Sequence, residues 1–244
     1  MDPLLLALLL AAVLVVAFLY SSVGHAGASG YIAVMSLAGL APEEIRPTAL
    51  VLNLFVATIT FWQFRRAGHF RWALFWPFAV LSIPMAALGG YVHLPTAGFK
   101  IAVGVVLLFS ATRLFVRPAE SAGERTPGRA VSLGVGGALG LVAGLTGTGG
   151  GIFLTPILVF LRWAPVKTAG AVSALFILVN SAAGLAGNQA AAGALPDYAW
   201  MLVIAVVAGG AAGSYLGSRR FDPIVVKRLL GVVLAIAGLK LVLV

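Results

Sequence analysis

The sequence predicts an all-α polytopic membrane protein, built from two inverted repeats of about five helical segments each. Three observations lead to this fold class: the composition, the recurrence of long apolar runs, and two glycine-rich interruptions at corresponding places. The 244 residues are 61% hydrophobic and 9% charged, with a mean hydropathy of +1.07. Few water-soluble domains have such a composition, and about 20 apolar residues suffice for a helix to cross a bilayer.

The apolar segments divide evenly between the two halves of the chain. We expect them at 4–20, 28–40, 47–64, 72–91 and 98–116, and then at 131–145, 150–161, 168–187, 198–217 and 224–243. This division gives a first membrane repeat (1–116), a cytoplasmic linker (117–130) and a second membrane repeat (131–244). Segments 28–40 and 150–161 are short for a spanning helix, so each either spans or re-enters the membrane.

Both short segments follow a glycine-rich stretch. The first stretch is Gly24–Gly30 (GHAGASG) and the second is Gly147–Gly151 (GTGGG). Glycine in a helix interior costs about 1 kcal/mol against alanine, and irregular backbone at membrane depth occurs only where it is buried in protein or lines a cavity. We therefore interpret both stretches as broken-helix loops at a polar site. The alternative is close helix packing, which glycine also permits.

The loops between segments carry opposite charge bias in the two halves. Loop 65–71 is basic, whereas its counterpart 187–197 contains no Lys or Arg. Loop 92–97 has none, whereas its counterpart 218–228 has four. By the positive-inside rule, the halves are inserted upside down relative to each other, with the linker inside and both termini outside. In this topology Arg46 falls on the outer side of the membrane, where Glu43 and Glu44 neighbour it.

Two glycine ladders have a spacing of four residues, which places each ladder on one helix face. They are Gly136, Gly140 and Gly144, and then Gly209, Gly213 and Gly217. Such small residues let a neighbouring backbone approach closely. We prefer helix packing to a hinge or a substrate-lining face as their role.

The ionisable residues limit the chemistry. All acidic residues fall in predicted loops or helix ends, which argues against a carboxylate proton relay, a cation pathway and a metal site. No cofactor is expected. His25 lies inside the first glycine loop, either as a hydrogen-bonded buried histidine or with a role in substrate or proton binding. The amides of Asn53 and Asn180 are costly to bury unless they are hydrogen-bonded.

These considerations predict one substrate site between the two glycine loops. Helix N-termini and glycine nests expose backbone N–H groups that suit an anion. The predicted binding residues combine the loop glycines with the polar side chains around them: Ser22, Gly24, His25, Gly27, Asn53, Thr146, Gly147, Thr148, Gly149, Gly150, Gly151 and Asn180.

An enzymatic alternative comes from the segment 27–30, which matches the Gly-x-Ser-Gly nucleophile pattern of rhomboid intramembrane proteases through Ser29. That chemistry needs a histidine from another helix, and the second half of the chain has none. A short pattern in glycine- and alanine-rich sequence also arises easily by chance.

Five motifs are spread over nearly the whole chain: His25–Tyr31, Arg46–Asn53, Arg66–Phe70, Gly147–Pro156 and Val172–Ser181. Together they resemble those of the TauE/SafE sulfite exporter family of membrane permeases. Ala26 and Ala28 depart from the adjacent glycines that members often show in the first loop. The resemblance implies transport of sulfite, organosulfonates or related small sulfur-containing anions.

We therefore expect a secondary transporter of a small sulfur-containing oxyanion in the inner cell membrane. Its partners are the small anionic substrate and the lipid bilayer, and the basic residues at helix ends reflect topology rather than nucleic-acid binding. An anion channel is the alternative, since the sequence does not separate a channel from a carrier.

Overall fold

The structure is a computed structural model that describes residues 2–92, 125–188 and 195–220, with isolated positions between 98 and 112 and between 235 and 242. These parts contain eight helices and no strand. The helices are α1 (Pro3–Ser22), α2 (Ala28–Leu37), α3 (Pro42–Arg66), α4 (Trp72–Tyr91), α6 (Arg129–Thr146), α7 (Gly151–Phe160), α8 (Val166–Gly187) and α9 (Ala199–Arg219).

The predicted all-α membrane class is confirmed. All helices except α2 and α7 are long and apolar enough to cross a membrane, and α2 and α7 have ten residues each. The predicted segments agree with the helices to within a few residues, except that α3 begins earlier, at Pro42. Segments 98–116 and 224–243, loop 92–97 and much of the linker lie outside the described residues.

The early start of α3 has a local cause. Pro42 occupies the first helical turn, where its missing N–H costs nothing. Glu43 and Glu44 follow, and negative charge is favourable at a helix N-terminus. The Glu44 carboxylate also accepts a hydrogen bond from the Ala41 N–H at 3.3 Å. Arg46 therefore belongs to a helix rather than to a loop.

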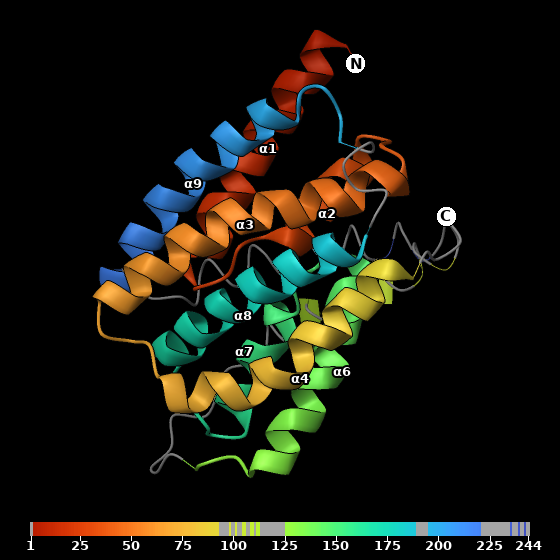
Figure 1. Cartoon of the computed structure of the whole chain (residues 1–244). Helices are drawn as coiled ribbons and strands as arrows, with labels where there is room; N and C mark the ends of the chain where they lie inside the picture. The colour runs from red at the N-terminus through yellow and green to blue at the C-terminus, as the bar shows by residue number, and fades with distance from the viewer. Residues whose placement is uncertain are drawn as a thin grey trace.

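The long helices pack as three pairs in layers (Figure 1). The central pair is α3 with α8, flanked by α1 with α9 on one side and α4 with α6 on the other. The spanning windows of α3 and α8 are 61% and 67% buried, more than those of the other spans. The centre of the protein therefore lies along α3 and α8, and any polar group there is removed from lipid.

Helix partners are exchanged between the two halves. The first helix of each half packs on the fourth helix of the other half, α1 on α9 and α6 on α4, while the third helices α3 and α8 pack on each other. Figure 1 shows α3 and α8 running in opposite directions, as their colours indicate. A pair of repeats related by a two-fold axis would pack in this way. The inverted insertion in the membrane stays a prediction, and this exchange supports it.

The two glycine ladders are the seams of these outer pairs, as predicted. A Cβ added to any ladder glycine would collide with a main-chain carbonyl of the partner helix. In the seam between α4 and α6, the facing carbonyls belong to Phe78, Ser82 and Ala86, opposite Gly136, Gly140 and Gly144 respectively. In the seam between α1 and α9, they belong to Leu14, Phe18 and Ser22, opposite Gly209, Gly213 and Gly217 respectively. The four-residue step recurs on both sides of each seam, so the backbones approach each other at three successive points over more than two helical turns.

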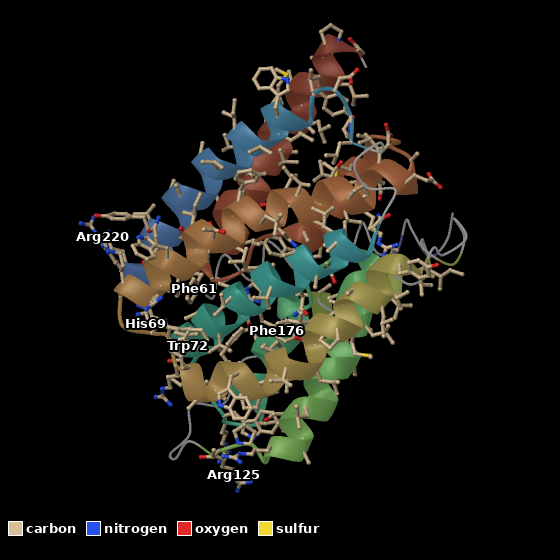
Figure 2. All side chains as sticks on the ribbon, viewed as in Figure 1. Phe61, His69, Trp72, Arg125, Phe176 and Arg220 are labelled. Atoms are coloured by element: carbon tan, nitrogen blue, oxygen red, sulfur yellow. The ribbon has the colours of Figure 1, made fainter. Side chains whose placement is uncertain are left out.

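Figure 2 shows where side chains of different character lie. Phe176 of α8 lies between the helices and is fully buried, whereas Arg220 and His69 lie at the end of the bundle where α3 and α9 terminate. The Gln63 amide, which donates to the Ala211 carbonyl at 3.1 Å, holds these two helix ends together. Arg65 and Arg66 in the last turn of α3 and Arg219 in the last turn of α9 lie at this same end, and the side of the membrane that this end faces stays a prediction.

Candidate functional site

The first glycine loop separates α1 from α2, as predicted. Gly24 and Gly27 have φ values of +87° and +106°, which L side chains rarely adopt. The Tyr31 hydroxyl donates to the Ala26 carbonyl at 2.5 Å and fixes the loop from within α2. A Cβ on Gly24 would lie 2.5 Å from the Cα of Gly170, so this loop packs against the backbone of α8.

The second glycine loop separates α6 from α7, and it contains backbone groups that a ligand could bind. Gly147, Gly149 and Gly150 all have φ values between +72° and +78°. The N–H groups of residues 148–150 have no acceptor within the described part of the chain, although these residues are buried. Buried N–H groups are normally paired. Three neighbouring donors without acceptors form the kind of backbone nest that binds anions.

Polar side chains surround this second loop. A Cβ on Gly149 would lie 2.9 Å from the Asn53 amide nitrogen and 3.0 Å from the Ser181 hydroxyl oxygen. Asn53 is fully buried, donates to Ser181 at 3.1 Å, and its amide oxygen has no donor among the described residues. The hydroxyls of Thr146 and Thr148 are 2.9 Å apart. Helices α3, α6 and α8 therefore all contribute polar groups at Gly149.

All twelve predicted site residues are buried, and some of their polar groups are hydrogen-bonded within their own helix. Asn180 donates to the Phe176 carbonyl at 2.8 Å within α8, which satisfies its amide nitrogen locally. Ser22 donates to the Leu19 carbonyl at 2.7 Å within α1. His25 is 7% exposed in the first loop. The groups that meet across helices are Asn53 and the second loop.

Both loops lie against α8, at different levels. The first loop contacts Gly170, and the second contacts Ile177 and Ser181. Seven residues from 170 to 177 correspond to about 10 Å along a helix. A shared site would therefore extend along α8, past Ser173, whose hydroxyl accepts a 2.7 Å hydrogen bond from Thr155 of α7. The single site between the loops stays a prediction.

Arg46 lies within α3 and is buried, whereas the predicted segment 47–64 left it in the preceding loop; its placement on the outer side of the membrane stays a prediction. Arg46 is only 6% exposed, and its guanidinium donates to main-chain carbonyls of α4, its C-cap and α6. Its side chain also contacts the second loop, since a Cβ on Gly147 would lie 3.1 Å from the Arg46 Cγ. One feature of the sequence could have indicated that Arg46 is buried: it is a basic residue on the side of the membrane where the positive-inside rule disfavours basic residues.

Ser29 does not have the surroundings of a protease nucleophile. Its hydroxyl is 2.9 Å from the Tyr20 hydroxyl and 2% exposed. The described residues contain no group of three or more His, Cys, Asp or Glu side chains that could hold a metal ion. The polar groups at the loops therefore suit binding rather than nucleophilic chemistry.

Comparison with known proteins gives two matches of nearly full length. The family model "Sulfite exporter TauE/SafE" matches residues 9–241. The chain is 40% identical over 232 residues to "Probable membrane transporter protein y4hK" of Sinorhizobium fredii (strain NBRC 101917 / NGR234), covering 93% of this chain and 94% of that protein. No solved structure matches. The chain therefore belongs to the TauE/SafE sulfite exporter family, and it is a multi-pass membrane transporter, not an enzyme.

Proposed function

We propose that the protein moves a small sulfur-containing oxyanion, such as sulfite or an organosulfonate, across the inner cell membrane. The observation that carries this proposal is the second glycine loop, which contacts Asn53 and Arg46 and whose three buried N–H groups have no acceptor among the residues that the structure describes. Each hydrogen bond to a charged oxygen contributes about 1.5–3 kcal/mol. An oxyanion at the loop would accept hydrogen bonds from donors that have no acceptor among the described residues.

The acidic residues support an anion rather than a cation. The described carboxylates are Asp2, Glu43, Glu44 and Asp197, and all lie at or beyond helix ends. A cation crossing the bilayer needs negative side chains or rings of carbonyls along its path. The membrane-spanning parts described here instead offer N–H donors and a guanidinium, which suit negative charge.

A flux experiment tests the substrate class. The purified protein in proteoliposomes is given sulfite, thiosulfate, sulfoacetate, sulfate and taurine, and uptake is followed at increasing concentration. We expect at least one of the anions to be transported with saturation and counterflow, as for a carrier. Uptake that rises without saturation and shows no counterflow would favour the anion channel. Absence of flux and binding for every anion would refute the proposal.

A matched pair of glycine variants tests the place of binding. Gly149→Ala adds a methyl group within 3.0 Å of Ile177, Asn53 and Ser181, whereas Gly68→Ala meets nothing within 4 Å. Their φ values are +72° and +80°, so both variants carry a similar backbone strain of about 1–2 kcal/mol. We expect Gly149→Ala alone to lose anion binding. Equal binding by both variants would move the site away from the second loop.

A further inference from the structure

Arg46 is a buried cation whose hydrogen-bond partners, within the described part of the chain, are all neutral. Its Nη1 donates to the Val92 carbonyl at 3.0 Å, and its Nη2 donates to the carbonyls of Gly89, Gly90 and Gly144 at 2.6–2.7 Å. No carboxylate forms an ion pair with it among the residues that the structure describes. Carbonyl groups orient their dipoles toward the guanidinium but leave its charge in place.

The carbonyls bound by Arg46 belong to two helix C-termini. Gly89 and Gly90 lie in the last turn of α4, and Gly144 lies in the last turn of α6. The last four carbonyls of a helix lack partners within the helix, and a helix C-terminus carries about half a negative charge. Helix α6 ends directly at the second glycine loop, so its C-terminus would repel an anion held there. The Arg46 guanidinium offsets this repulsion.

The Arg46 side chain also faces the loop itself. A Cβ on Gly147 would lie 3.1 Å from the Arg46 Cγ and 3.2 Å from its carbonyl oxygen. The Arg46 Nε–H is buried without an acceptor in the described residues. An isolated charge is costly to bury at membrane depth, and such residues mark ion pathways more often than they serve packing. The arrangement thus leaves one positive charge at the C-terminus of α6, next to the second loop, and one donor without an acceptor in the described part of the chain.

Arg46 caps the C-terminus of α4 and also binds the C-terminus of α6, and a comparison with the second half of the chain shows which of these contacts the two halves share. Lys167, near the start of α8, donates to the Ser218 carbonyl in the last turn of α9 at 3.2 Å. Capping of the fourth helix by a basic residue of the third is therefore common to both halves. Lys167 is only half-buried and makes this single hydrogen bond through its side chain among the described residues, whereas Arg46 is 6% exposed and also binds α6. The additional contact with α6 is what connects Arg46 to the second loop.

We propose that Arg46 is the specificity-determining charge of the anion site, a positioning residue that makes the second loop prefer the more negative of two ligands of similar shape. This inference rests on the proposed function, because it requires an anion at the loop. Coulomb energy scales with the product of the charges. Removal of the guanidinium charge should therefore weaken a dianion about twice as much, on a logarithmic scale, as a monoanion.

The test compares binding of sulfate, a dianion, with binding of methanesulfonate, a monoanion, to the purified full-length protein. In Arg46→Gln we expect methanesulfonate affinity to fall about tenfold and sulfate affinity about a hundredfold. Arg66→Gln, an exposed position at the far end of α3, removes the same net charge and should leave both affinities unchanged. If Arg46→Gln weakens both ligands by the same factor, Arg46 is only a helix cap and the inference is overturned.

A second variant keeps the test decisive if Arg46→Gln does not fold. Arg46→Lys retains the charge but cannot reproduce the four carbonyl contacts. We expect a lower melting temperature together with a sulfate-to-methanesulfonate affinity ratio within about twofold of wild type. A ratio that collapses although the charge is present would overturn the inference. Wild-type protein that binds neither probe nor sulfite would instead overturn the proposed function, which is a distinguishable result.

Discussion

The glycine seam between α4 and α6 allows a stability prediction with an internal control. In Gly140→Ala, the new Cβ would lie 2.6 Å from the Cα of Ser82 and closer still to its carbonyl oxygen. Carbon atoms in contact are normally about 3.5–4.0 Å apart, so α4 would have to retreat by about 1 Å. Overpacking of this kind costs about 1–3 kcal/mol, and a backbone obstacle places it at the upper end.

Alanine recovers part of that cost, because it is favoured over glycine in a helix by about 1 kcal/mol. We therefore expect Gly140→Ala to lose about 2 kcal/mol net, or about 4–8 °C in melting temperature for a chain of this size. Gly134→Ala, in the same helix with nothing within 4 Å of the added Cβ, should melt about 2–4 °C higher than wild type. Size-exclusion chromatography of heated, detergent-solubilised protein measures both. Gly140→Ala melting at or above wild type would refute the packing argument.

Three further predictions concern topology, pH and the first loop. Single cysteines placed at Asp197 and Arg219, in a chain without native cysteine, should be labelled from opposite sides of the membrane; labelling from one side would contradict the inverted arrangement. Histidine gains its charge as the pH falls between about 8 and 5, so methanesulfonate binding should strengthen on acidification in the wild-type protein but not in His25→Gln. If the pH profile of binding is the same in both proteins, His25 is not the group responsible for the pH dependence. Tyr31→Phe leaves the Ala26 carbonyl unpaired and should lower stability by about 1–3 kcal/mol in a thermal melt, whereas a wild-type melt would show that this hydrogen bond contributes little.

The helices and loops were predictable because their causes are local. Apolar runs fixed the spans, clustered glycines fixed the breaks before Ala28 and Gly151, and four-residue glycine steps identified the seams. The burial of Arg46 against α4 and α6 was not predictable, because its partners are main-chain carbonyls, which residue types do not reveal. The contact of Gly24 with Gly170 likewise joins two backbones from opposite halves, so residue types alone could not reveal it.

The exchange of helix partners has a consequence for biogenesis. The carbonyls of α1 that face the α9 ladder are synthesised about 200 residues before their partner, and at about 5–20 residues per second the ribosome needs about 10–40 s to supply it. During that interval α1 must remain in the lipid, with its seam covered by acyl chains or by an insertion factor. A nascent chain interrupted before α9 therefore displays an unmatched helix face, which is a signal that membrane quality-control proteases could recognise.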